Sequence, residues 1–230
     1  MINKFTNLAA ALALAVVSSV SVASESDSTA VLRAASDFVY RGQDLTGSQG
    51  TVGLGLRFDN VVWDGVYVAG DFDTVEVTPL NDNTQVRTDF EVGYSNVWNS
   101  LNYSVSLARV LNPVNYSSDY TELRARGQYS FVYAEVGQGI SNDINTDTYF
   151  SVGIEGRPFS PNLLLGTSVS FINYDGDAVG VSNVEWNNYE VYASYDLWRE
   201  LDVAVGYSFG GDTPTVGLDD HAWIGASYTF

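Results

Sequence analysis

The sequence predicts an all-β fold, a transmembrane antiparallel up-and-down β-barrel of about twelve strands that follows a cleaved signal peptide. Three observations predict this fold. Apolar residues recur at every second position in twelve segments, which places them on one face of each strand. The connections between these segments alternate between long and short. The final segment alternates from Ala222 to Tyr228 and ends on the aromatic Phe230, as the closing strands of outer-membrane barrels do.

Residues 1–23 have the pattern of a secretory signal peptide. Lys4 supplies a positive charge, an apolar run extends from Leu8 to Val17, and small residues at 21–23 precede the expected cleavage site. The apolar run is too short to span a membrane as a helix. We therefore expect residues 24–230 to form one exported barrel domain.

Composition narrows the function classes. Cysteine is absent, so disulfides and thiol chemistry play no part. The 28 acidic residues outnumber the 10 Lys and Arg residues, and the net charge of −18 makes binding to nucleic acid phosphates unfavourable. The 15 Tyr, 5 Trp and 21 Gly residues suit a barrel with aromatic girdles and closely packed strands.

Each predicted strand is a short segment of alternating polarity. In the clearest one, Val86, Phe90 and Val92 alternate with Arg87 and Glu91. The approximate strand cores are 30–41, 49–58, 64–74, 84–94, 100–110, 119–129, 131–140, 147–157, 163–173, 187–196, 200–209 and 221–230. The residues predicted to face lipid include Val86, Phe90, Val92, Phe150, Val152, Ile154, Val191, Val203, Val205 and Ile224.

The connections predict the orientation of the barrel. The long connections, expected to be external loops, are 42–48, 75–83, 111–118, 141–146, 174–186 and 210–220. The short turns, expected on the periplasmic side, lie near 60–63, 96–99, 130, 158–162 and 197–199. Trp63, Trp98 and Trp198 fall at these turns, and Trp186 and Trp223 near the opposite rim, as expected for the two water–membrane boundaries. A secreted β-sandwich is the alternative, but its core would have to bury residues such as Arg87 and Glu155.

A family resemblance follows the mature chain in order. The stretch Ser36-Asp37-Phe38-Val39-Tyr40-Arg41-Gly42 resembles the SDYxFRG opening of the TorF-type porin family, although Gln43–Thr46 departs from the family's next, xSQT-like stretch. Val66–Asp71 resembles the second block, GFYAGxW, and Glu91–Tyr94 and Tyr120–Leu123 resemble later blocks. The resemblance implies an outer-membrane barrel with a channel role and does not identify a solute.

The parity opposite to the lipid face collects charged residues, which we predict to line a pore. They are Arg33, Asp37, Arg41, Arg57, Arg87, Asp89, Glu91, Glu122, Arg124, Arg126, Glu135, Glu155, Arg157 and Glu190. One interpretation is a lumen whose charges filter solutes. The other is that arginines and acids pair and brace a closed barrel, because twelve strands lie between filled and open barrels.

The predicted external loops are acidic, with Asp175, Asp177 and Asp219 among their residues. They could attract cations toward a mouth or form a solvated rim of like charges. The segment Asp143–Asp147 begins like a calcium loop but lacks the sharp-turn Gly and the distal bidentate Glu, so no metal site is expected.

The predicted function is passive passage of small hydrophilic solutes or ions through the charged lumen, without a cofactor. A non-conducting structural or surface-interaction barrel is the alternative. An outer-membrane hydrolase using His221, the only histidine, ranks third, so we do not expect an enzyme.

The expected location is the outer membrane of a Gram-negative-type envelope. The expected partners are its lipid and lipopolysaccharide, small solutes, and the barrel-assembly machinery, which would recognise the strand ending in Phe230.

Overall fold

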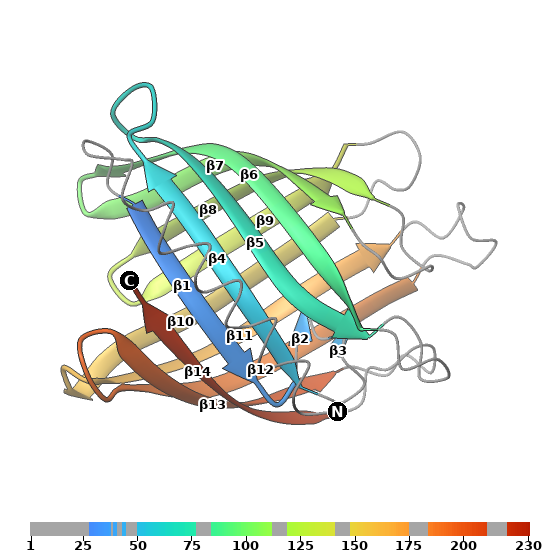
Figure 1. Cartoon of the computed structure of the whole chain (residues 1–230), viewed down its shortest axis with the longest axis vertical. Coiled ribbons are helices and arrows are strands. Elements are labelled where there is room, and N and C mark those ends of the chain that lie inside the picture. Colours follow the sequence, from blue (N-terminus) through green and yellow to red (C-terminus); the bar gives the residue numbers. More distant parts are fainter. Residues whose placement is uncertain are drawn as a thin grey trace.

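The computed structural model of the chain describes residues 28–37, 39–40, 43–44, 50–76, 84–111, 119–140, 148–174, 184–210 and 220–230. Twelve strands close into one antiparallel barrel, as the sequence predicts (Figure 1). They are β1 (Ser28–Ala35), β4 (Thr51–Asp59), β5 (Val66–Glu76), β6 (Thr84–Trp98), β7 (Leu101–Leu111), β8 (Tyr120–Tyr129), β9 (Val132–Gly139), β10 (Thr148–Ser160), β11 (Leu163–Tyr174), β12 (Val184–Asp196), β13 (Leu201–Gly210) and β14 (His221–Thr229). Among the described residues, no helix is long and apolar enough to cross a membrane.

The first and last strands close the barrel. β1 pairs with β4 on one side and with β14 on the other, where Val31 faces Thr229 and Ala35 faces Gly225. The backbone N–H of Phe230 donates to the carbonyl of Ala30 at 2.8 Å. Each barrel strand therefore has two paired neighbours, which satisfies its backbone groups where lipid offers no hydrogen bonds.

The predicted alternation of the strands is confirmed. On β6, Phe90 and Val92 are each 48% exposed on the outside, whereas Arg87, which has the opposite parity, is 3% exposed on the inside. On β14, Ile224 is 56% exposed, and the alternation continues to Phe230. An apolar outer face and a polar inner face are the pattern of a barrel that stands in a membrane.

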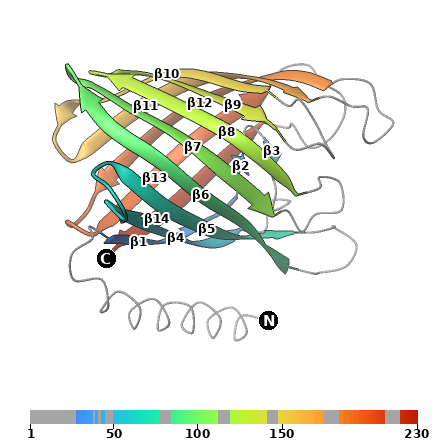
Figure 2. The ribbon, with the colours of Figure 1, turned by 90° about the horizontal axis from the view of Figure 1, so that it is seen from above.

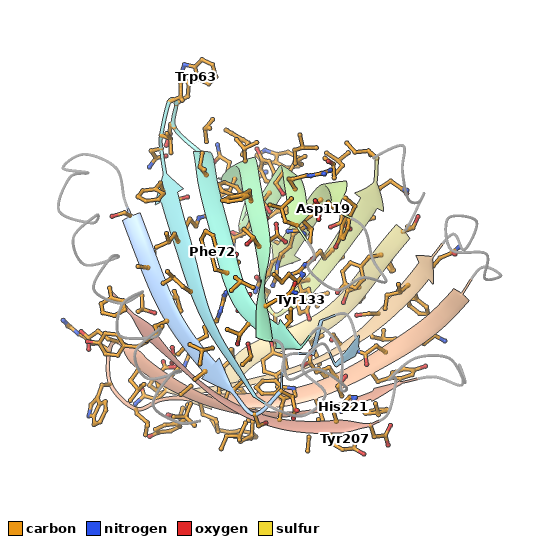
Figure 3. The ribbon with its side chains drawn as sticks, turned by 45° about the vertical axis from the view of Figure 1, so that its right-hand side comes forward. Trp63, Phe72, Asp119, Tyr133, Tyr207 and His221 are labelled. Atoms are coloured by element: carbon orange, nitrogen blue, oxygen red, sulfur yellow. The ribbon has the colours of Figure 1, made fainter. Side chains whose placement is uncertain are left out.

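The short turns gather at one end of the barrel (Figure 2). Each short turn has an exposed aromatic side chain in it or within two residues of it: Trp63, Trp98, Phe131, Phe159 and Trp198. Trp63 stands at the tip of the β4–β5 turn, away from the wall (Figure 3). The predicted tryptophan positions at this end are confirmed.

Two of the predicted turns are wrong in their bounds. β6 continues to Trp98, so the 96–99 turn is instead formed by Asn99 and Ser100, both with positive φ (46° and 68°), as a two-residue hairpin requires. β10 continues to Ser160 through a register shift after Gly156, so only residues 161–162 remain for the turn.

The first predicted strand, 30–41, is too long. β1 ends at Ala35. Ser36 still donates its backbone N–H to the carbonyl of Ile224 at 2.8 Å, but the Ile224 N–H donates to the side-chain hydroxyl of Ser36, which in turn donates to Asp37. Such local side-chain bonds compete with a sheet ladder. Val39–Tyr40 (β2) and Gln43–Asp44 (β3) pair as a separate two-stranded sheet, whose labels lie within the barrel outline in Figures 1 and 2.

Several predictions lie outside the described residues. They are the signal peptide 1–23, Arg41, the central parts of the external loops with Asp175, Asp177 and Asp219, and the calcium-like segment 143–147.

Candidate functional site: the barrel interior

The inner face of the barrel carries more acids than arginines. The inward arginines on the barrel strands are Arg33, Arg57, Arg87, Arg124, Arg126 and Arg157. The inward acids are Asp59, Asp71, Asp73, Asp89, Glu91, Glu122, Glu135, Glu155, Glu190, Asp196 and Asp202. The interior therefore has a surplus of negative charge, and its cations lie within reach of carboxylates.

Arg124 on β8 is the centre of the most buried charge cluster. Its guanidinium donates to Asp89 at 2.7 Å, to Glu91 at 3.1 Å and to Glu122 at 2.7 Å. The side chain of Glu122 is 1% exposed and that of Asp89 is 9% exposed. Three carboxylates around one guanidinium use most of its donors, so the cluster links β6 to β8 and stabilises the wall.

Arg33 connects β1 to β5 across the strand between them. Its guanidinium lies 2.5 Å from Asp71 and 3.4 Å from Asp73, both on β5. The inward positions of the intervening strand β4 are Gly53 and Gly55, and a Cβ at either would meet these side chains. Because these two positions have no side chains, Arg33 can reach Asp71 and Asp73 across β4.

Four inward aromatic rings each cover a glycine on the neighbouring strand, and each ring and its glycine are direct register partners. The pairs are Tyr67 with Gly93, Tyr133 with Gly153, Tyr192 with Gly166, and Trp223 with Gly206. A side chain at any of the four glycines would collide with the ring. The glycines therefore allow these rings to lie against the wall, which limits how far they reach into the interior.

The rings also hold charged groups in place. The guanidinium of Arg57 lies 3.7 Å from the ring centroid of Tyr67, and that of Arg126 lies 4.5 Å from the centroid of Tyr133. The hydroxyl of Tyr192 donates to Glu155 at 2.8 Å. Two glycine–tyrosine–arginine stacks thus stand on the inner wall, each combining close packing with a cation–π contact.

The remaining predicted residues are placed as follows. Arg126 is held by its stacking on Tyr133 and by two longer ion pairs, 3.6 Å from Glu135 and 3.4 Å from Glu155. Arg157 binds Asp196 at 2.8 Å near the short turns. Glu190 faces inward on β12, where its register partner on β11 is Ser168. Asp37 lies beyond the end of β1, not on it.

Arg87 and Glu122 also belong to the inner face, but their exposed fractions of 3% and 1% leave little surface toward an aqueous path. Whether the whole predicted set lines a pore stays a prediction.

The sequence reasoning missed five inward acids: Asp59, Asp71, Asp73, Asp196 and Asp202. Strand parity could have identified Asp71 and Asp73, because they alternate with Val68 and Phe72. It also missed the apolar inward residues Val75, Val110 and Ile172, which are 1%, 0% and 3% exposed. The inner face is therefore not uniformly polar.

Trp223 does not belong to the outer girdle that the sequence predicts. Its parity points inward, and its ring covers Gly206. The alternation along β14 places Trp223 on the inner face. Its register partner Gly206 has no side chain and therefore leaves space for the indole against the wall.

A serine–histidine neighbourhood was also missed. Gly206–Gly210 has the spacing Gly-x-Ser-x-Gly, and its Ser208 is the register partner of His221. The motif lies within a continuous strand, however, not at the strand-to-helix turn that exposes a nucleophile. Ser208 is 2% exposed and donates its proton to Asn188 at 2.7 Å. This geometry does not present a nucleophile to a substrate.

Within the described residues, no group of three or more His, Asp or Glu side chains is arranged to hold a metal ion.

Comparisons with known proteins place the fold. Neither the family models nor the curated proteins that were searched include a match. Among solved structures, the KdgM porin aligns with a TM-score of 0.60 at 10% identity over 88% of this chain and 99% of that chain, as does the KdgM porin in complex with disordered oligogalacturonate. The NanC porin aligns with a TM-score of 0.55 at 7% identity over 86% of this chain and 98% of that chain. The chain thus has the fold of outer-membrane porins.

Proposed function

We propose that this protein is an outer-membrane channel that gives passive passage to small hydrophilic solutes and ions, with a preference for cations. The observation that carries the proposal is the charged inner face of a closed barrel whose outer face is apolar. A sealed structural barrel needs polar residues inside only where they can pair. The inward acids outnumber the inward arginines, so pairing with arginine does not account for all of them. This surplus supports an aqueous interior.

The cation preference follows from the same excess. Asp71 is 41% exposed and Glu155 is 20% exposed, so carboxylates of the inner face reach water. A low-dielectric wall screens such charges less than bulk solvent does. Cations are therefore enriched along the acids, and anions are depleted.

The proposal includes a location in the outer membrane and a route of assembly. An expected signal peptide at residues 1–23 would export the chain, and the aromatic end of β14 at Phe230 would present it to the barrel-assembly machinery of a Gram-negative-type envelope. Lipopolysaccharide and outer-membrane lipid would contact the apolar outer face. The resemblance to the TorF-type porin family supports the same class of function.

One of the KdgM porin structures is a complex with oligogalacturonate, a polyanionic saccharide. We do not extend that ligand to this chain, because the acidic surplus of its interior repels a polyanion.

A non-conducting structural barrel is the second candidate, and the Arg124 cluster favours it. Its buried carboxylates link β6 to β8 as a brace would. Liposome swelling separates the two candidates. Proteoliposomes with the folded barrel should swell in an isosmotic solution of a small uncharged solute, whereas a structural barrel leaves them at the rate of protein-free liposomes.

A hydrolase using Ser208 and His221 is tested separately. His221→Ala and Ser208→Ala should leave the swelling rate and the fold unchanged. A hydrolytic activity on lipid or ester substrates that disappears in both variants would reverse the ranking of channel above enzyme.

A further inference from the structure

A cavity of ≈ 390 Å³ lies against the inner face of β6, β7 and β8, near the short-turn end. Its inward side chains are Arg57, Ser95, Asn102, Ser104, Arg126 and Gln128. This volume corresponds to about thirteen molecules of liquid water, enough for a small organic solute with part of its hydration.

The two arginines of the cavity are held apart by the wall. The guanidinium of Arg57 reaches Ser95, 3.3 Å from its hydroxyl, and Ser95, Ser104 and Arg126 are successive register partners on β6, β7 and β8. Two strand spacings separate Ser95 from Arg126, or about 10 Å. The cavity thus has two serines as its floor and a guanidinium at each side.

Both guanidiniums are fixed before any ligand binds. Arg57 is stacked on Tyr67 and Arg126 on Tyr133, and each tyrosine rests on a glycine of the wall. Groups that are already immobilised lose little conformational entropy on binding.

The charges of the cavity argue against an ionic ligand. The described side chains that line it include no carboxylate, which disfavours a cation. Its two arginines already have partners outside the lining: Asp59 lies 2.8 Å from Arg57, and Glu135 and Glu155 lie near Arg126. Three acids thus offset two arginines, which disfavours an anion.

What the cavity offers is hydrogen bonding without net positive charge. Guanidinium, amide and hydroxyl groups provide many donors and several acceptors. We propose that this cavity is a binding subsite for a neutral polyhydroxylated solute, a sugar or polyol of about monosaccharide size. The inference deepens the proposed function, because it names a class of solute that the interior would hold on its way through.

The test is saturation-transfer NMR on the folded barrel in detergent, with glucose, gluconate and glucosamine as matched neutral, anionic and cationic probes. Glucose should give the strongest transfer. Ser104→Trp fills the cavity and should weaken glucose binding about tenfold or more, equivalent to losing one or two hydrogen bonds. Arg126→Gln, which keeps the shape of the wall but removes guanidinium donors, should weaken it less.

The matched control is Ser194→Trp, an inward serine on β12 that is also near the short turns but outside the cavity. It should leave glucose transfer unchanged. Equal losses in Ser104→Trp and Ser194→Trp, stronger transfer to gluconate or glucosamine, or no transfer to glucose would each overturn the proposal. Gel mobility before and after heating verifies that each variant is folded. Since binding is measured without a membrane, a barrel that binds glucose but gives no liposome swelling would contradict the channel and leave the subsite standing.

Discussion

Tyr192 on β12 places its ring over Gly166, its direct register partner on β11. Its hydroxyl donates a hydrogen bond to Glu155 on β10 at 2.8 Å. One side chain therefore spans three strands along the inner wall. A related arrangement lies on the other side of the barrel, where Tyr67 on β5 covers Gly93 and donates its hydroxyl to Glu91, both on the adjacent strand β6. The glycines keep these rings against the wall and thereby determine how much of the interior stays open.

Gly166→Ala should destabilise the barrel and narrow its interior. The new methyl group would displace the Tyr192 ring, with a cost of about 1–3 kcal/mol in the free energy of unfolding. Gly127→Ala is the control, because a Cβ there meets only Leu101 at an ordinary 3.7 Å. Urea unfolding followed by gel mobility measures both variants. Equal stabilities would mean that the ring adapts without strain.

Arg124→Gln should be the most destabilising substitution of an inward arginine. It would leave Asp89, Glu91 and Glu122 without their shared cation, and removing one partner from a buried charge pair costs about 3–5 kcal/mol. Arg157→Gln is the control, because Arg157 is 39% exposed; its loss should cost less than about 1 kcal/mol. Similar unfolding midpoints for the two variants would contradict the bracing role of the Arg124 cluster.

Arg126 and Asp71 should shift ion selectivity in opposite directions. At about 10 Å in water one unit charge contributes about 0.4 kcal/mol, which changes the local concentration of cations about twofold and that of anions about twofold in the opposite sense, so their ratio changes about fourfold. Arg126→Gln should therefore raise the cation-to-anion permeability ratio about fourfold, and Asp71→Asn should lower it by a similar factor. Conductance recorded under a salt gradient measures the ratio. Shifts of the same sign would show that these charges do not act on permeating ions.

The tryptophans should differ in their contact with lipid. Trp98 is 67% exposed beside a short turn, whereas the ring of Trp223 covers Gly206 on the inner face. In variants that retain a single tryptophan, lipids brominated near the headgroup should quench the fluorescence of Trp98 strongly and that of Trp223 weakly. Equal quenching would contradict the inward placement of Trp223.

Much of the fold follows from periodicity alone. Alternation along segments such as Val86–Tyr94 fixes both the strand and its outward face, because a shift of one residue would turn every apolar side chain inward. Strand ends are harder to predict. β1 stops at Ala35 because Ser36 and Asp37 form a local hydrogen bond, and β10 continues past Pro158 through a register shift. Neither strand end is marked by a break in the alternation of the sequence.

The site was predicted less completely, and the reason is also physical. Parity identifies the inward arginines, but not their partners, which depend on register between strands far apart in the chain. Arg33 and Asp71 are 38 residues apart and meet only because β4 carries glycines between them. The glycine under each inward ring likewise becomes meaningful only once Tyr192 and Gly166, or Trp223 and Gly206, are known to be opposite each other.

Planar-bilayer recording of the purified, folded barrel under a potassium chloride gradient tests the central claim most directly. The acidic surplus of the inner face predicts stepwise conductance with a reversal potential of the sign that marks cation preference, and a preference that weakens as salt screens the charges. A bilayer that stays silent although the inserted barrel is folded would contradict the channel. A reversal potential of the opposite sign would contradict the role assigned to the inward carboxylates.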